Sequence, residues 1–394
     1  MKRLMIIGAG FLQDFVIVRA NAMGYETVTV DMDPDAVGFS HAGEHAVINI
    51  TDQEACLAYA REKHINGVLT AATDYGVLTA SYIARELGLP GLHYATAQRI
   101  KNKYEVRKCL EENHVDDTGF SFALCSEGDV AACARAMAFP LMVKPCDGSG
   151  SRGASRVDSR DELLAAYRYA CANSMTHRAV AEPFVEGREY GVESLVIQGE
   201  IHVLGIMKKW MTDAPFYAEL GHAMPSGLDE CMEEKIKACV TSALRALEVN
   251  HGSVNMDILV TEQGSVHIVD VGARMGGNMI GPCIIPMGTG IDYMGNMIRA
   301  AVGDAPDWSV GPREAVASRL LAFHKGVVQP LPEMREVEDR FRVRIYHHME
   351  EGQQVQEYRT NLDGCGYVIA GAENVFAAEQ QVVAAKMYLE QYIQ

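Results

Sequence analysis

Two lysines and two aspartates stand where an isolated charge would be costly. Lys144 ends an apolar strand pattern, so its ammonium group needs an anion such as a phosphate. Lys103 lies on a preceding helical segment and can approach the same anion, although alone it is typical of a solvated helix face. Asp257 and Asp270 lie on two apolar segments that we expect to pair as a hairpin. Both carboxylates would then face one side, where a Mg²⁺ ion that also binds phosphate oxygens can balance their negative charge.

A loop rich in glycine and serine spans residues 147–153. Its backbone amides can close over phosphate oxygens, although such a loop is equally typical of a surface turn. Arg274 follows the second aspartate, and its planar guanidinium suits a transferring phosphoryl group or a substrate carboxylate. The alternative for Arg274 is a structural salt bridge with an aspartate.

The segment from Glu182 to Glu189 is typical of a strand that leaves a core and bends. Backbone groups at Glu182 and Val185 can match the edge of an adenine ring, and Phe184 can wall the pocket. Glu189 can accept hydrogen bonds from ribose hydroxyls. Taken alone, this segment is also an ordinary connection between strands.

A weaker pattern lies at the N-terminus. Gly8-Ala9-Gly10 followed by Asp31 is part of a dinucleotide-binding fingerprint, but Gln13 replaces its third glycine. We therefore favour a structural turn over a nicotinamide-dependent oxidoreductase. Thr73 and Asp74 follow another strand pattern, where open sheets place ligands, and a helix N-cap is the alternative.

The elements that must position these residues alternate between strand and helix in the first 90 residues, which predicts a parallel sheet covered on both faces. Further on, a glycine–proline break near residue 90 precedes a long charged helix and then strand pairs. We expect strands at 4–7, 25–30, 46–50, 68–71, 120–125, 141–144, 190–197, 201–208, 253–260 and 266–271, and helices at 11–23, 53–63, 77–87, 97–113, 161–172 and 230–247.

The composition limits the classes of function. The 394 residues carry 35 basic and 52 acidic side chains, a net charge of −17, which opposes broad binding to nucleic acids or anionic membranes. No apolar run is long enough to span a bilayer. The ten cysteines include no CxxC pair and are typical of reduced thiols, so we expect a cytoplasmic protein.

The order and spacing of these motifs resemble the ATP-grasp superfamily over most of the chain, to about residue 300. Within it, the chain most resembles carboxylate–amine ligases of the amino-acid and dipeptide ligase kind. The resemblance implies an α/β fold with α+β lobes. It implies a doubly wound N-terminal domain (1–92), an ATP-grasp domain (93–305) with a lid lobe near 115–185 and a large lobe near 186–305, and a small C-terminal α/β domain (306–394).

The resemblance also implies roles for particular residues. Its cofactors are ATP and Mg²⁺, with Mn²⁺ as the alternative metal. The segment around His222 resembles one near the substrate site, where this imidazole would orient a substrate carboxylate or acyl phosphate. The implied ATP contacts are Lys103, Lys144, Ser149, Gly150, Ser151, Gly153, Glu182, Phe184, Val185 and Glu189; the metal ligands are Asp257 and Asp270; the catalytic residues are Arg274 and His222; and the substrate contacts are Thr73, Asp74 and Asn278.

One departure from the family pattern concerns the metal. Asp270-Val271-Gly272 stands where the family usually has Glu-x-Asn. Because aspartate is shorter and glycine offers no side-chain oxygen, we expect one metal contact to be missing, or to be replaced by water or by Asn278. The number of metal ions therefore stays open.

The function that the resemblance implies is ATP-dependent formation of an amide or peptide bond through an acyl phosphate. The partners would be a small-molecule carboxylate and an amine, with a homodimer as the base-rate expectation. The alternatives are a bicarbonate-dependent carboxylase or carboxyamino-purine-precursor synthetase, and an ATP-binding protein without turnover.

Overall fold

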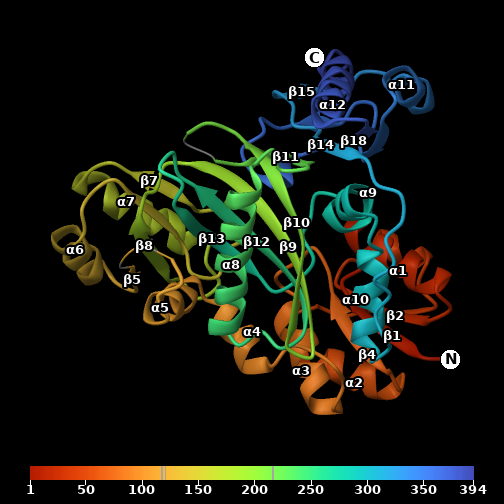
Figure 1. Ribbon diagram of the computed structural model, residues 1–394, viewed down its shortest axis with the longest axis horizontal. Helices are drawn as coiled ribbons and strands as arrows, with labels where there is room; N and C mark the ends of the chain where they lie inside the picture. Colours follow the sequence, from red (N-terminus) through yellow and green to blue (C-terminus); the bar gives the residue numbers. More distant parts are fainter. Residues whose placement is uncertain (117–118, 120, 215–216) are drawn as a thin grey trace.

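The computed structural model describes residues 1–394 except 117–118, 120 and 215–216 (Figure 1). Its N-terminal sheet is parallel, in the order β3-β2-β1-β4. Leu4 and Ile6 of β1 pack in one core with α1, whereas Met5 and Ile7 pack in another with α2 and α3. Helices thus cover both faces, which confirms the predicted doubly wound sheet. The elements are β1 (Arg3–Ile7), α1 (Phe11–Ala22), β2 (Glu26–Asp31), β3 (Glu44–Val47), α2 (Gln53–Glu62), β4 (Gly67–Thr70) and α3 (Val77–Leu87).

The long helix predicted at 97–113 is wrong. The structure has two helices, α4 (Tyr94–Lys101) and α5 (Lys103–Glu112), separated by Asn102. Asn102 has an extended backbone, with φ −110° and ψ 105°, and its side chain accepts hydrogen bonds from the backbone N–H groups of Tyr104 and Glu105. Asparagine is a preferred N-cap for this reason. The break places Lys103 at the first position of α5.

A smaller antiparallel sheet follows, in the order β5-β8-β6-β7, with its own core under α6 and α7. The glycine–serine loop joins β6 to β7 at the edge of this sheet. Phe120, where the strand 120–125 was expected to begin, lies outside the described residues. The elements are β5 (Phe122–Leu124), α6 (Glu127–Ala136), β6 (Leu141–Pro145), β7 (Ser155–Val157), α7 (Arg160–Ala172) and β8 (Ala179–Pro183).

An eight-stranded antiparallel sheet forms the centre of the molecule, in the order β13-β12-β9-β10-β11-β14-β18-β16. Figure 1 shows the N-terminal sheet and the α6–α7 lobe on opposite sides of it. Its first five strands belong to the predicted large lobe, and its last three belong to the predicted C-terminal domain. The domain boundaries near residues 92 and 305 stay predictions, and this sheet continues across the second.

The strands of this sheet and the elements around it have the following bounds. The strands are β9 (Arg188–Ile197), β10 (Glu200–Met211), β11 (Glu219–Met224), β12 (Gly252–Val260), β13 (Val266–Gly272), β14 (Ala315–Leu320), β16 (Arg344–His347) and β18 (Gly366–Ala372). The others are α8 (Glu230–Ala246), a π-helical turn (Ile280–Ile284), α9 (Ile285–Thr289), α10 (Tyr293–Ala301), α11 (Met334–Phe341), α12 (Val375–Glu390) and the short pair β15 (Gly326–Val327) and β17 (Gln354–Val355).

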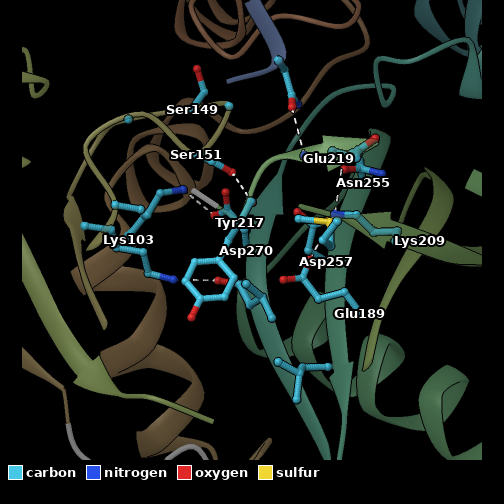
Figure 2. A pocket seen from close by; sticks show the side chains of 18 of the residues that line it. Lys103, Ser149, Ser151, Glu189, Lys209, Tyr217, Glu219, Asn255, Asp257 and Asp270 are labelled. Carbon is cyan, nitrogen blue, oxygen red and sulfur yellow. Dashed lines mark hydrogen bonds and ion pairs between the residues drawn. The ribbon is translucent and has the colours of Figure 1, made fainter. Parts of the chain in front are cut away.

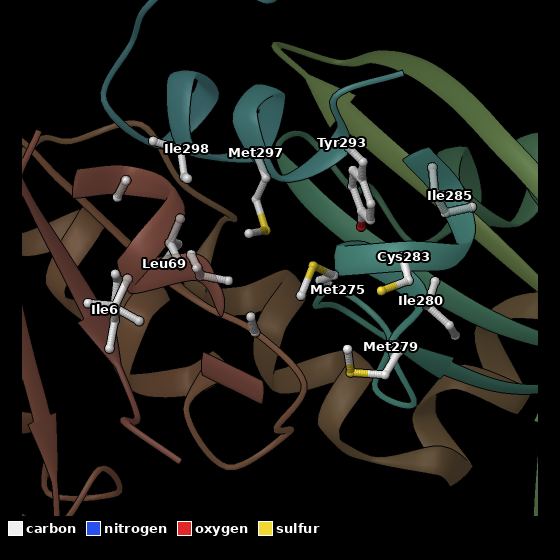
Figure 3. Packing of buried hydrophobic residues seen from close by; sticks show 14 of the residues in the cluster. Ile6, Leu69, Met275, Met279, Ile280, Cys283, Ile285, Tyr293, Met297 and Ile298 are labelled. Carbon is white, nitrogen blue, oxygen red and sulfur yellow. The ribbon is translucent and has the colours of Figure 1, made fainter. Parts of the chain in front are cut away.

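A methionine-rich core fixes the segment after β13 to the N-terminal sheet (Figure 3). Met275 and Met279 are buried in the same cluster as Ile6 and Leu69. The backbone N–H of Ala72 also donates to the carbonyl of Met275, at 3.0 Å. Because thioethers fill irregular gaps, these methionines suit a joint between two sheets. The joint brings the end of β4 beside the end of β13, where several predicted site residues lie.

Among the described residues, no helix combines the length and the apolar character that crossing a bilayer requires.

Candidate functional site

A pocket of about 680 Å³ brings together residues from α1 and the β4–α3 connection, from the small sheet and from the eight-stranded sheet. Figure 2 shows part of its lining. Lys144, Glu189, Asp257 and Asp270 all line it, although they are far apart in sequence. The other predicted site residues that line this pocket are Thr73, Asp74, Lys103, Ser149, Gly150, Ser151, Glu182, Phe184, Val185, His222, Arg274 and Asn278. The geometry therefore supports a common site, and the roles of the individual residues stay predictions.

Gly153 is not among the residues that line the pocket. Its φ is 76°, and a Cβ there would lie 2.7 Å from both Asn173 Cβ and Pro145 Cγ. Only glycine combines this left-handed backbone with so close an approach. Gly153 therefore shapes the end of the loop, while Ser149, Gly150 and Ser151 face the pocket.

Lys144 shares a buried carboxylate with an arginine that the sequence analysis missed. Its Nζ lies 2.5 Å from Glu182 Oε1 and donates to the carbonyl of Val269 at 3.0 Å. The Nε of Arg107 donates to the other Glu182 oxygen at 2.7 Å. Burial nevertheless holds the pKa of Lys144 below its ordinary value, although Glu182 opposes the shift. A further anion at this point would stabilise the charged lysine.

Lys103 pairs with Asp270 across the pocket, as Figure 2 shows, with 2.5 Å between Nζ and Oδ1. Burial raises the pKa of Asp270, but Lys103 and Lys144 outweigh it, and the net pKa lies below the ordinary value. Asp270 is the register partner of Asp257 in the antiparallel pair β12–β13. The expected hairpin is therefore present, and because directly opposite residues share one face of a sheet, both carboxylates lie on the pocket side.

Lys209 on β10 is the main site residue that the sequence analysis missed. Its side chain is 2% exposed, and Nζ lies 2.7 Å from Asp257, 3.3 Å from Glu189 and 3.5 Å from Glu219. Burial alone would lower the pKa of Lys209, but Asp257 and its neighbours hold it well above the ordinary value. The adjacent Lys208 points the other way and pairs with Glu379. Successive residues of a strand point to opposite faces, so one of two neighbouring lysines must point inward. The sequence does not show which of the two it is.

The described residues contain no group of three or more His, Cys, Asp or Glu side chains arranged to hold a metal ion. Asp257 and Asp270 supply two facing carboxylates, and each is paired with a lysine. Mg²⁺ in phosphate sites commonly takes one or two carboxylates and completes its shell with phosphate oxygens and water. The donor set thus fits a Mg²⁺ ion that arrives with a triphosphate, and it does not form an all-protein cage.

The position of the missing family asparagine is filled by an ion pair. A Cβ on Gly272 would lie 3.1 Å from Arg274 Cζ and 3.2 Å from Asp74 Oδ1. Asn278, the predicted substitute ligand, donates from Nδ2 to Glu219 instead. A larger side chain at 272 would thus press on the Arg274–Asp74 pair, and the substitute role of Asn278 stays a prediction.

Arg274 forms the salt bridge that the sequence analysis gave as its alternative. Its Nε lies 3.0 Å from Asp74 Oδ1, and its Nη2 donates to Asp74 Oδ2 at 3.3 Å. The N-cap of α3 is Gly76, so the N-cap alternative for Thr73 and Asp74 is wrong. Both Asp74 and Arg274 line the pocket, which leaves the guanidinium available to a ligand on its pocket side.

His222 is buried against Glu219. It is 1% exposed, and its Nδ1 lies 3.1 Å from Glu219 Oε1. Burial lowers the pKa of His222 although Glu219 opposes the shift, so the imidazole is neutral near pH 7. A neutral imidazole in the pocket can donate or accept a hydrogen bond.

Part of the pocket lining is apolar. Met142, Phe184 and Ile268 belong to it. The guanidinium of Arg156 lies 4.4 Å from the centre of the Phe184 ring, and the Tyr217 ring lies 5.9 Å from it. The hydroxyl of Ser151 donates to the carbonyl of Tyr217 at 3.1 Å, so the glycine–serine loop touches the β10–β11 connection. An apolar ring of the lining such as Phe184 can pack against a flat group, and Glu189, which lines the same pocket, offers a carboxylate for polar contacts.

The N-terminal fingerprint is a structural turn. Asp31 accepts a hydrogen bond from the backbone N–H of Ala9 at 2.8 Å. Gln13 is buried and donates to the carbonyl of Ala71 at 2.5 Å. Its side chain lies against Gly8 and Gly10, where a pyrophosphate would need open backbone. The geometry thus favours the structural interpretation.

Glu193 supports the floor of the pocket and was also missed. It is fully buried and accepts hydrogen bonds from the Gly276 N–H at 2.9 Å, the Tyr293 hydroxyl at 2.5 Å and the Asn255 amide at 2.9 Å. Asn255 in turn lines the pocket (Figure 2). Burial raises the pKa of Glu193 from 4.5 to about 7, although the three hydrogen bonds oppose it.

This pKa predicts a pH dependence of stability. Between about pH 4.5 and 7 the folded chain keeps the Glu193 proton that the unfolded chain has lost, so Glu193 makes stability fall as pH rises. A Glu193→Gln variant should lack this fall, which amounts to about 3 kcal/mol across the window. Urea unfolding of both proteins from pH 5 to pH 8 measures the difference. Parallel stability curves for the two proteins would contradict the prediction.

Comparison with known proteins bears on the family and the fold of this chain. Residues 137–282 match the family model of the ATP-grasp domain. An uncharacterized protein, y4rH, of Sinorhizobium fredii is 28% identical over 67% of this chain and 55% of its own length. Formate-dependent phosphoribosylglycinamide formyltransferase of Burkholderia pseudomallei is 29% identical over 57% of this chain and 55% of that protein. This chain thus spans about half the length of the curated relatives it matches.

Solved structures share the complete fold. The L-amino acid ligase of Bacillus licheniformis superposes with a TM-score of 0.85 at 24% identity, covering 100% of this chain and 98% of that one. Phosphoribosylglycinamide synthetase of Anaerococcus prevotii gives a TM-score of 0.77 at 19% identity, with the same coverage. The chain has the ATP-grasp fold, and its residues 137–282 match the ATP-grasp domain, which confirms the predicted resemblance.

Proposed function

We propose that this protein is an ATP-dependent carboxylate–amine ligase. The observation that carries the proposal is the convergence of Lys103, Lys144, Asp257 and Asp270 in one pocket whose lining is partly apolar. The relatives named as an amino acid ligase and a formate-dependent formyltransferase support the same class of reaction. We also propose that the N-terminal domain ends near residue 92 and that the ATP-grasp domain ends near residue 305.

In the proposed reaction a substrate carboxylate oxygen attacks the γ-phosphorus of ATP, and the bond to the β–γ bridging oxygen breaks. The products are an acyl phosphate and ADP. The nitrogen of an amine then attacks the acyl carbon, phosphate leaves with the bonding electron pair, and the amine loses a proton. No covalent bond to the protein is needed, so the protein contributes positioning and charge neutralisation.

The residues divide this work according to their place in the pocket. Lys103 and Lys144 would hold phosphate oxygens, and a phosphate beside Lys144 would offset the burial that lowers its pKa. Arg274 would stabilise charge on the moving phosphoryl group. Mg²⁺, bound with ATP at Asp257 and Asp270, would supply further charge neutralisation. His222 would orient the acyl group through its neutral imidazole.

The adenosine part of ATP would lie against the apolar part of the pocket lining. The backbone at Glu182 and Val185 would meet the adenine edge, beside Phe184, and Glu189 would accept from the ribose hydroxyls. The carboxylate of Glu182 has a separate task, because it joins Lys144 to Arg107. The loop at 147–153 would close over the phosphates and exclude water, since an acyl phosphate hydrolyses readily.

A second candidate function uses the same acyl-phosphate reaction, with formate as the carboxylate substrate. The observation that favours it is the 29% identity to the formate-dependent formyltransferase. Formate would then be required for ATP turnover in the presence of an amine.

A phosphate-release screen tests the proposed function. The purified full chain is incubated with MgATP and with amino acids singly and in pairs, and with formate or bicarbonate plus an amine. We expect release that requires both an acid and an amine. Turnover that requires bicarbonate would replace the ligase with a carboxylase, and MgATP binding without release under any pair would contradict the ligase.

A further inference from the structure

A second pocket of about 380 Å³ opens from the candidate site. We call it the side pocket. It lies between the first turn of α1, the β4–α3 connection and the strands β16 and β18. Leu12, Ala72, Thr73, Asn361 and Tyr367 line both pockets, so the two pockets adjoin each other. A ligand in the side pocket would therefore lie beside the main pocket, which Arg274 and His222 line.

Three aromatic rings, those of Phe11, Tyr346 and Tyr367, line the side pocket. Of these residues, Phe11 is 39% exposed. Its ring centre lies 6.3 Å from that of Tyr367, nearly parallel at 11°, and 6.4 Å from that of Tyr346. Leu12 and Leu320 add aliphatic surface. Such a lining favours an apolar, preferably flat, group.

The described residues that line the side pocket include no lysine, arginine, aspartate or glutamate. Arg344 interacts with Tyr346 and Cys283 and is not part of the lining. His347 accepts a hydrogen bond from the Met349 N–H at Nδ1, and burial lowers its pKa, so it is neutral near pH 7. Phosphate sites in proteins are usually built from arginine, lysine and oriented N–H groups.

The rival occupant is a phosphoryl group at the N-terminal turn of α1. That turn also carries Asp14, which is a like charge and would oppose a phosphate dianion. The nearest partner of Asp14 is His41, whose Nδ1 lies 2.8 Å from Asp14 Oδ1, outside the side pocket. The charges of this region thus favour a neutral side chain over a phosphate.

We propose that the side pocket holds the aromatic or large aliphatic side chain of an amino-acid substrate that carries no phosphate. This inference rests on the proposed function and specifies its substrate class. The amino acid would extend its reacting group past Thr73 and Tyr367 into the main pocket.

Calorimetric titration of the full chain tests the inference, with L-phenylalanine, glycine and ribose 5-phosphate as probes, each with and without MgADP. L-Phenylalanine should bind at least tenfold more tightly than glycine, because it buries an aromatic ring. Ribose 5-phosphate should show no saturable binding. Tighter binding of ribose 5-phosphate than of L-phenylalanine would overturn the inference.

Two variants locate the binding. Gly364 lines the side pocket only, has φ −75° and ψ 140°, and would carry a Cβ no closer than 3.4 Å to Leu320 Cδ2. The backbone thus accepts a Cβ at residue 364, so Gly364→Leu should fill part of the pocket and weaken L-phenylalanine binding at least tenfold. Phe11→Ala should do the same by removing a wall. Val18→Ala is the matched control, because Val18 is 44% exposed on the same helix and lines neither pocket.

The outcomes separate this inference from the proposed function. Unchanged affinity for L-phenylalanine in both Gly364→Leu and Phe11→Ala overturns the side pocket as its site. MgADP binding in wild type without L-phenylalanine binding overturns the substrate class alone. Failure to bind MgADP contradicts the proposed function, whereas the titration without nucleotide still tests the side pocket. Both variants should bind MgADP as wild type does.

Discussion

Asp257→Asn is expected to lower ATP-dependent phosphate release by at least about 100-fold, the scale of losing one group that neutralises transition-state charge. The fold should survive the change. Lys209 loses its partner at 2.7 Å but keeps Glu189 at 3.3 Å and Glu219 at 3.5 Å, so no unpaired charge is left buried. Phosphate release at saturating substrates, together with thermal unfolding, measures both parts of the prediction.

Glu262→Gln is the matched control for this variant. Glu262 is exposed in the turn that joins β12 to β13, so the control removes one carboxylate from the same hairpin outside the pocket. Its activity should equal that of wild type. Retained activity in Asp257→Asn would remove Asp257 from the proposed metal site.

Lys209→Met is expected to destabilise the folded state by about 3–5 kcal/mol at pH 7.5, as for other buried ion pairs that lose one member. The reason is that Asp257, Glu189 and Glu219 would face one another without their shared cation. Burial already raises the pKa of Glu189 in the presence of Lys209. Without Lys209 this pKa should rise further, so protonation would stabilise the variant as pH falls.

Urea unfolding at pH 7.5 and 5.5 tests this expectation. The stability difference between wild type and Lys209→Met should shrink at the lower pH. Lys208→Met is the matched control, because Lys208 is 40% exposed and pairs with Glu379 on the other face of the strand. This control should cost less than about 1 kcal/mol. An equal loss for both lysines, or a difference that does not depend on pH, would contradict the account.

The sequence predicts much of the fold because two patterns are strong. Alternation of apolar strands and amphipathic helices predicts the N-terminal parallel sheet, and the structure has it. Two apolar segments around Glu262-Gln263-Gly264 predict the hairpin that sets Asp257 opposite Asp270. The break at Asn102 is less visible, since the flanking residues favour helix on both sides. Asparagine there is a capping signal that the prediction of one long helix overlooked.

The site is harder to predict because its charges meet across strands. Arg107 and Glu182 pair over 75 positions in the sequence, and no local pattern links them. The inward direction of Lys209 depends on the register of β10, in which a bulge shifts the pairing with β9. The closeness of Asp74 and Arg274 to Gly272 is likewise seen only in the structure. The pairing register of strands that are far apart in sequence thus determines which side chains meet in the pocket, and residue spacing alone does not predict it.

Calorimetric titration with MgADP of wild type and Lys144→Met tests the central claim most directly. The claim is that distant lysines and aspartates form one nucleotide site. Wild type should bind one MgADP per chain, and Lys144→Met should bind at least tenfold more weakly. Its fold should persist because Arg107 still pairs with Glu182 at 2.7 Å. Lys108→Met, at an exposed position of α5, should bind as wild type does. No saturable binding by wild type, or equal affinity in Lys144→Met, would contradict the account.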